Sequence, residues 1–297
     1  MPVWIPITFA AAFAQNLRSL LQKKLRDSLS VWGATAARFV FAAPLAVIVA
    51  LAAWCAGGAS LQSPRPAFLG LMVAGGLAQI IATGCMIHLF SFRNFAVGTA
   101  FTKTEALQTA LFGLILLGET LNIYALAAIM AGLAGVLLIS LPPESKGTRL
   151  KVDGRIIYGL LSGGLFGLSA VCFRGASLTL GDGPAFVRAS ITLGCVLVFQ
   201  ALAIGVWLRF REPGELKRMF TAWRITGLVG LAGVSASLCW FTAMAMVNAA
   251  LVRAVGQVEI VFTVATSWFF FRETISAREF TGLGILTLSI VALILLA

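Results

Sequence analysis

Two glutamates, Glu105 and Glu259, lie 154 residues apart in segments that are otherwise strongly apolar. Each has a cation and an amide within one or two helical turns, namely Lys103 with Gln108 in the first segment and Arg253 with Gln257 in the second. A carboxylate is costly at membrane depth, and ionisable groups there mark solute pathways or proton relays. The repeated clusters therefore predict a site that binds a polar substrate, with the two glutamates as candidates for proton coupling.

The same residues could instead hold the protein together. Glu105 could form an internal salt bridge with Arg253, and Glu259 could form one with Lys103, which would lock two parts of the chain to each other. Both roles are compatible if the bridges open during transport. The spacing alone does not choose between them.

A second polar stripe lies in the first apolar segment, where Gln15, Arg18 and Gln22 follow the helical spacing i, i+3, i+7. The apolar run before it, residues 3–14, is too short to cross a bilayer alone. Part of the stripe is therefore expected to face protein or water and to form a wall of the pathway. The alternative is a span that ends early, with Arg18 reaching to the membrane surface.

Two further arginines, Arg38 and Arg188, come early in the second and seventh apolar segments. An arginine can bind a carboxylate or phosphate through its two-pronged guanidinium, although both residues could also be interfacial anchors. Together the deep cations outnumber the deep carboxylates, Glu105 and Glu259; the cations are Arg18, Arg38, Lys103, Arg188 and Arg253. This surplus favours amino acids or organic anions as cargo. Trp240 and Trp268 are deep enough in their segments to border a cavity.

The composition indicates that membrane-spanning helices position these residues. Hydrophobic residues make up 60% of the 297-residue chain and charged residues 11%, whereas charged residues form about a quarter of an ordinary globular protein. A helix needs about 20 apolar residues to cross the hydrocarbon core. Ten such stretches occur, at roughly 3–24, 31–56, 67–89, 95–117, 122–141, 155–177, 184–208, 223–246, 249–271 and 278–297. The sequence thus predicts an all-α integral membrane protein with ten transmembrane helices.

The two halves of the chain repeat each other. At an offset of 154 residues, identical residues recur, with Asn94, Ala96, Ala100, Glu105, Thr109, Glu119 and Thr120 matching Asn248, Ala250, Ala254, Glu259, Thr263, Glu273 and Thr274. Residues 1–141 form the first five-helix repeat, 142–154 a polar linker and 155–297 the second repeat. Because five is odd, the second copy enters the bilayer from the opposite side, which predicts two inverted repeats.

The net charge of +11 would suggest nucleic acid in a soluble chain. Here the lysines and arginines gather after the odd-numbered spans, as they do in the cytoplasmic loops of membrane proteins. We therefore expect no nucleic-acid partner, an inner (plasma) membrane location with the lipid bilayer as partner, and both termini on the outer face.

Short motifs at the ends of two spans point to a family. Gly118-Glu119-Thr120 closes the fourth span and Arg272-Glu273-Thr274 the ninth, and an arginine lies early in spans two and seven. With ten spans in two halves, the whole chain resembles the EamA family of the drug/metabolite transporter superfamily. The resemblance implies a secondary transporter with a central cavity walled by both halves, commonly for amino acids or other small metabolites. Close relatives in this family differ in substrate.

Several chemistries are disfavoured by missing motifs. The sequence has no Walker loop, no H-E-x-x-H and no G-x-S-x-G, and His88 is its single histidine. We expect a secondary active or facilitative transporter that binds a small-molecule substrate and uses alternating access, with no cofactor or metal, and with protons as a candidate coupling ion. The alternative is an intramembrane lipid-headgroup-processing enzyme or flippase. The sequence leaves monomer and homodimer open.

Overall fold

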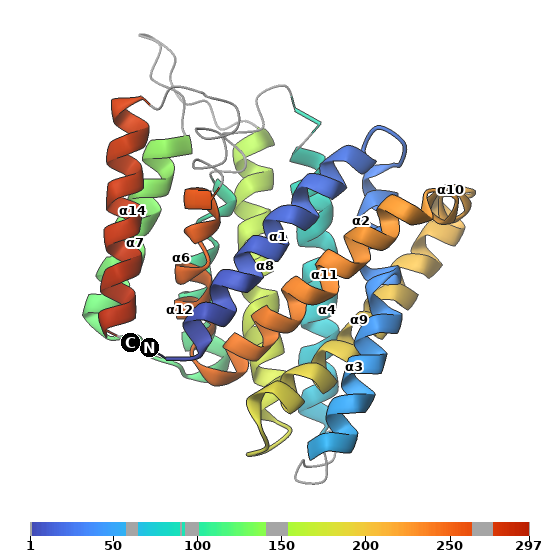
Figure 1. Ribbon diagram of the computed structural model, residues 1–297, viewed down its shortest axis with the longest axis horizontal. Coiled ribbons are helices and arrows are strands. Elements are labelled where there is room, and N and C mark those ends of the chain that lie inside the picture. The colour runs from blue at the N-terminus through green and yellow to red at the C-terminus, as the bar shows by residue number, and fades with distance from the viewer. Residues whose placement is uncertain are drawn as a thin grey trace.

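The chain folds into a bundle of helices (Figure 1). The computed structural model describes residues 2–57, 65–89, 91–92, 101–140, 154–262 and 276–296, and within these ranges it contains no strand. Its helices are α1 (Trp4–Leu25), α2 (Val31–Val40), α3 (Ala42–Gly57), α4 (Pro66–Leu89), α6 (Glu105–Leu117), α7 (Ile123–Ser140), α8 (Gly154–Leu178), α9 (Ala185–Arg211), α10 (Glu215–Thr221), α11 (Trp223–Met246), α12 (Ala249–Val255) and α14 (Ala277–Leu296).

Some features of the sequence fall outside the described residues. They are Asn94, Ala96, Ala100, Thr263, Trp268, Arg272, Glu273, Thr274 and most of the linker 142–154.

Six helical segments of the described chain are long and apolar enough to cross a membrane: Val31–Gly57, Pro66–Leu89, Ile156–Leu178, Ala185–Arg211, Trp223–Met246 and Ala277–Leu295. Two shorter apolar helices, Glu105–Leu117 and Ile123–Ile139, accompany them. The remaining expected spans are α1, whose 22 residues include the polar stripe, and the segment that begins with α12. The structure therefore shows an all-helical membrane protein, and the number of ten crossings stays a prediction.

The distribution of polarity is that of a protein in lipid. Large apolar side chains such as Ile48, Leu202 and Leu288 are 64%, 65% and 70% exposed, whereas Arg18, Gln22 and Arg38 are buried. In water, so much exposed apolar surface would drive association, but lipid tails solvate it. The polar stripes predicted from the sequence therefore face the interior of the bundle.

The most extensive helix contacts join the first half of the chain to the second. They pair α4 with α8, α7 with α14, α1 with α11, α3 with α9 and α6 with α8. In Figure 1, α1 and α8, the first helices of the two halves, run in opposite directions, and both chain ends lie at the same end of the bundle. The halves are therefore interlocked, and the interior between them is lined by both.

Glycine allows the closest of these approaches. A Cβ atom at Gly135 of α7 would lie 2.8 Å from the carbonyl oxygen of Gly282 in α14, and one at Gly282 would lie 2.7 Å from the carbonyl oxygen of Gly135. Backbone therefore meets backbone at this crossing, as in membrane helix pairs with small residues at their contact.

Candidate functional site

Helix interruptions at matching places in the two halves position the candidate site. A turn at Lys103 and Thr104 precedes α6, and a turn at Gly256 and Gln257 follows α12. Lys103 and Gln257 are equivalent at the offset of 154 residues. Interrupted helices free backbone groups from helical hydrogen bonds, and in transporters such breaks occur where the backbone lines a cavity.

The two glutamates form ion pairs across the halves. Lys103 Nζ contacts Glu259 Oε1, and Arg253 Nε lies 3.0 Å from Glu105 Oε1. The sequence predicts these two bridges as the structural alternative to a substrate-binding role, and the structure contains both. Each carboxylate of one half is thus held by a cation of the other half.

A third contact joins the same two turns. Gln257 Nε2 donates a hydrogen bond to the backbone carbonyl of Lys103 at 3.1 Å. Gln257 is 6% exposed, so this bond forms in a largely dry environment in which an unpaired amide would be costly. The turns therefore contact each other directly.

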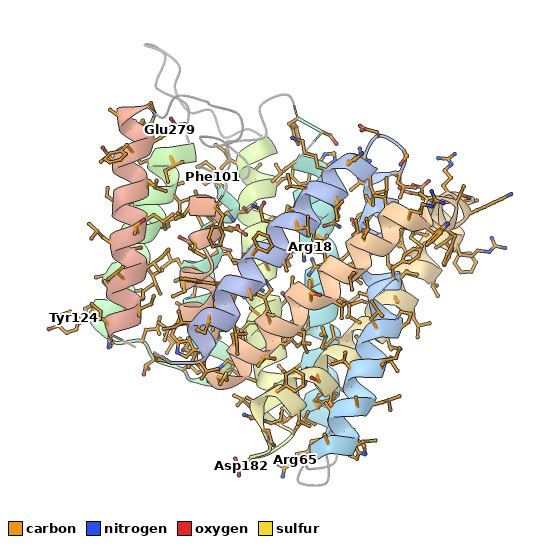
Figure 2. All side chains as sticks on the ribbon, viewed as in Figure 1. Arg18, Arg65, Phe101, Tyr124, Asp182 and Glu279 are labelled. Atoms are coloured by element: carbon orange, nitrogen blue, oxygen red, sulfur yellow. The ribbon has the colours of Figure 1, made fainter. Side chains whose placement is uncertain are left out.

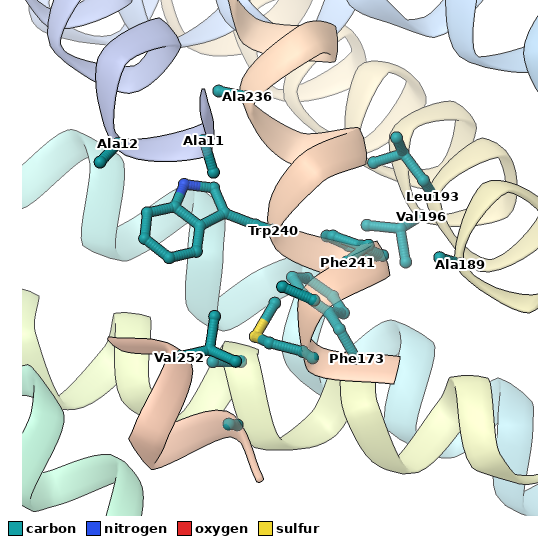
Figure 3. Packing of buried hydrophobic residues seen from close by; sticks show 14 of the residues in the cluster. Ala11, Ala12, Phe173, Ala189, Leu193, Val196, Ala236, Trp240, Phe241 and Val252 are labelled. Carbon is teal, nitrogen blue, oxygen red and sulfur yellow. The ribbon is translucent and has the colours of Figure 1, made fainter. Parts of the chain in front are cut away.

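Side chains of α1 and α11 also contact these ion pairs. Gln15 Nε2 donates to Glu259 Oε2 at 3.1 Å, and the indole Nε1 of Trp240 donates to Gln15 Oε1 at 3.0 Å. The Trp240 ring also lies under the Arg253 guanidinium, 4.7 Å from its Cζ, at the distance of a cation–π contact. Figure 3 shows Trp240 between α1, which carries Ala11 and Ala12, and α12, which carries Val252.

A cavity opens among these groups. The space between these side chains is small and partly open to the outside, and its volume is about 280 Å³ when the open part is included. It is lined by Gln15, Lys103, Glu105, Ala106, Trp240, Arg253, Gly256, Gln257 and Glu259. Six of the ten candidate residues from the sequence therefore line one cavity, namely Gln15, Lys103, Glu105, Arg253, Gln257 and Glu259.

Arg18 and Arg38 do not line this cavity but are buried in the interior of the bundle. Arg18 is 1% exposed and lies near the centre of the molecule in Figure 2, and Arg38 is 4% exposed. Arg38 Nη1 donates to Thr83 Oγ1 of α4 at 2.9 Å. Neither arginine reaches the surface of the bundle, so the alternative in which Arg18 extends to the membrane surface is not what the structure shows.

The structure places Gln108 and Arg188 away from the cavity. Gln108 packs against Gly164 of α8 and donates to Thr104 Oγ1 at 2.9 Å. Arg188, in the first turn of α9, donates to the carbonyl of Ala245 at 3.3 Å. The sequence positions of Gln108 and Arg188 were compatible with a shared site, but their side chains contact α8 and Ala245 instead.

Arg174 is a charged residue that the sequence analysis missed. Its Nε lies 2.5 Å from Glu119 Oε1, and its Nη1 donates to the carbonyls of Met244 and Val247 at 2.5 and 2.7 Å. Arg174 of α8 thereby links Glu119, just after α6, to the end of α11, in keeping with a structural role for Glu119. A lone arginine within an apolar segment was the available signal.

Comparison with known proteins gives the same architecture. The model of the EamA-like transporter family matches residues 2–141 and, a second time, residues 155–295. The chain belongs to the EamA-like transporter family. This EamA-like protein is therefore a multi-pass membrane transporter of the drug/metabolite transporter superfamily, a class whose members are transporters and not enzymes.

One crystal structure of another protein shares this fold. It aligns over 99% of the EamA-like chain and 97% of its own, with a TM-score of 0.70 and 17% sequence identity. Among curated proteins, none matches the chain in sequence.

Proposed function

We propose that this protein moves an amino acid or another small organic anion across the inner (plasma) membrane by alternating access. The supporting observation is the cavity between the halves, where Lys103 pairs with Glu259 and Arg253 with Glu105. A site held by equivalent residues of two opposed halves can be exposed first to one side and then to the other when the halves rock. In this mechanism, opening on one side requires the bridges to separate or exchange partners.

The proposal includes ten membrane crossings in two inverted repeats. The opposite directions of α1 and α8 and the location of both chain ends at one end of the bundle support it (Figure 1). The short or polar segments, α1, α6 and α12, surround the cavity, where neighbouring helices and not lipid satisfy their polar groups.

The substrate class follows from the charges of the interior. Arg18, Arg38, Lys103 and Arg253 are grouped with Glu105 and Glu259, so the described interior carries more positive than negative groups. A substrate with a carboxylate or phosphate would offset this excess. Glu105 and Glu259 would couple transport to protons, since protonation of either carboxylate releases its bridge.

Flux into liposomes tests the proposal. The purified protein, reconstituted into vesicles and given a panel of labelled amino acids, organic anions and amines, should show saturable uptake of an anionic or zwitterionic compound. The double variant Glu105→Gln/Glu259→Gln should lose proton-driven net flux while retaining exchange of substrate for substrate.

Two results would count against the proposal. Unchanged proton-driven flux in the double variant would remove the glutamates from coupling. Absence of saturable flux with every compound, together with transfer of fluorescent headgroup lipids between leaflets of the same vesicles, would favour the flippase alternative.

A further inference from the structure

Arg18 is a buried cation without an ion-pair partner among the described residues. Its Nε and Nη1 atoms are buried and have no hydrogen-bond partner in that part of the chain. One turn further along α1, fully buried Gln22 donates through Nε2 to the carbonyl of Ala34 at 3.1 Å, but its own side-chain oxygen is unpaired there. Donor and acceptor groups are therefore left open on one face of the helix.

The groups around Arg18 add to its positive charge. The side chains of Arg18 and Arg38 meet at Gly233 of α11, where a Cβ atom would lie 3.7 Å from Arg18 Cδ and 3.5 Å from Arg38 Cγ. Arg253 also repels Arg18 electrostatically. Glu105, a carboxylate near enough to attract Arg38, is already paired with Arg253.

Arg253 connects this group to the cavity. It lines the cavity, and although its Nε is 3.0 Å from Glu105 Oε1, the two atoms are not aligned as a hydrogen bond. An N–H group of Arg253 is therefore available for a better acceptor. Gln15, which also lines the cavity, lies one turn before Arg18 on α1.

A buried guanidinium with cationic neighbours and unused N–H groups is costly unless an anion neutralises it. The planar guanidinium matches the two oxygens of a carboxylate or phosphate. We propose that Arg18 and Arg253, with Arg38 adjacent, form a subsite for the carboxylate or phosphate group of the transported molecule. The identity of the ligand as cargo rests on the proposed function, but binding of an oxyanion can be measured without transport.

The test is the thermal unfolding of the full-length protein in detergent. Sodium acetate and sodium phosphate are compared with sodium chloride at equal ionic strength. The wild-type Tm should be higher in at least one oxyanion than in chloride, by roughly 2 to 4 °C. Arg18→Met should lose this rise and, because a buried charge is removed, should unfold in chloride at a temperature no lower than the wild type.

Two other variants keep the test decisive. Arg18→Lys retains the charge but not the two-pronged geometry, so it should keep part of the rise even if Arg18→Met does not fold. Arg209→Met removes an exposed arginine at the end of α9 and should behave as the wild type. The subsite would be overturned if Arg18→Met showed the same rise in Tm as the wild type, or if the wild-type Tm were no higher in either oxyanion than in chloride.

The outcome is separable from that of the transport proposal. Saturable flux combined with an anion effect that does not depend on Arg18 would overturn the subsite alone. An anion effect that requires Arg18, in a protein that shows no flux with any compound, would support the subsite and contradict the transport proposal.

Discussion

The charged residues of the cavity have a structural and a proposed functional role at once. Glu105 and Glu259 each accept a cation from the opposite half of the chain, so they hold the halves together in this conformation. A bridge that only stabilised the fold could be replaced by well-packed apolar residues, often at no cost. In the proposed mechanism charge is useful, because a proton would neutralise the carboxylate of a bridge and an anionic substrate would take its place beside the cation.

The energetic coupling of one bridge can be measured directly. Lys103→Met and Glu259→Gln should each lower the free energy of unfolding by about 1–3 kcal/mol, because each leaves a charged group in the interior without its partner. This expected loss is smaller than that for a fully buried pair, because the Lys103 and Glu259 side chains are 23% and 14% exposed.

The double variant Lys103→Met/Glu259→Gln should lose less stability than the two single variants added together. Denaturant unfolding in mixed micelles provides the comparison. Strictly additive losses would mean that the contact contributes nothing to stability.

At the scale of elements, close helix contacts and helix interruptions shape the interior. The crossing of α7 and α14 at Gly135 and Gly282 is tight, whereas the turns at Lys103 and Gln257 open the helices beside the cavity. The end of α6 is also defined by a turn, where Gly118 adopts a φ of 66° and Glu119 N–H bonds to the carbonyl of Gly113 at 3.1 Å. This left-handed cap directs Glu119 toward Arg174.

The crossing of α7 and α14 predicts a large difference between two glycine substitutions. Gly135→Ala should destabilise the protein by about 1–3 kcal/mol, because the added Cβ meets backbone atoms that cannot rotate away. These atoms are the Gly282 carbonyl oxygen at 2.8 Å and the Leu286 nitrogen at 2.9 Å.

Gly284→Ala is the matched control on α14, since its Cβ would have nothing within 4 Å. It should leave stability unchanged or raise it by up to about 1 kcal/mol, because alanine is more favourable than glycine inside a helix. Both variants can be compared by thermal unfolding in one detergent, and equal melting temperatures would show that α7 and α14 do not cross this closely.

At the scale of the molecule, the helix pairs repeat the duplication seen in the sequence. In the repeat, α1 corresponds to α8, α4 to α11 and α7 to α14. Exchange of the two halves therefore maps the contact of α1 with α11 onto the contact of α8 with α4, and the contact of α7 with α14 onto itself. An inverted repeat produces this pattern, because each half presents the same surface to the other. The segments 95–117 and 249–271, which contain α6 and α12, also correspond to each other, and the cavity lies beside the contact of α6 with α12.

The orientation of the bundle can be checked with reporter fusions. Alkaline phosphatase fused after Ala297 should be active and green fluorescent protein at that position dark, because the basic connections at the opposite end are expected in the cytoplasm. Fusions after Thr221, at the end of α10, should give the reverse. The opposite pair of signals would invert the proposed topology.

Much of the site was predictable because its signals are local. The apolar segments, the early arginines and the Glu-Thr motifs at the ends of spans four and nine led to the family, and the repeat at 154 residues led to the paired glutamates. Spacing also placed Gln15 and Arg18 on one face of α1, and the structure has both in the interior. Helical geometry relates such residues without any knowledge of neighbouring helices.

Which side chain meets which depended on the tertiary structure. Only the packing of distant helices decides that Lys103 pairs with Glu259 and Arg253 with Glu105, that Gln108 faces α8, and that Arg174 reaches Glu119. A one-dimensional spacing shows that residues share a helix face, but the crossing angle and contact partner of that face depend on segments far away in the chain. The sequence by itself therefore determined the class of protein and the charged residues of its interior, while the fold selected which of them form the cavity.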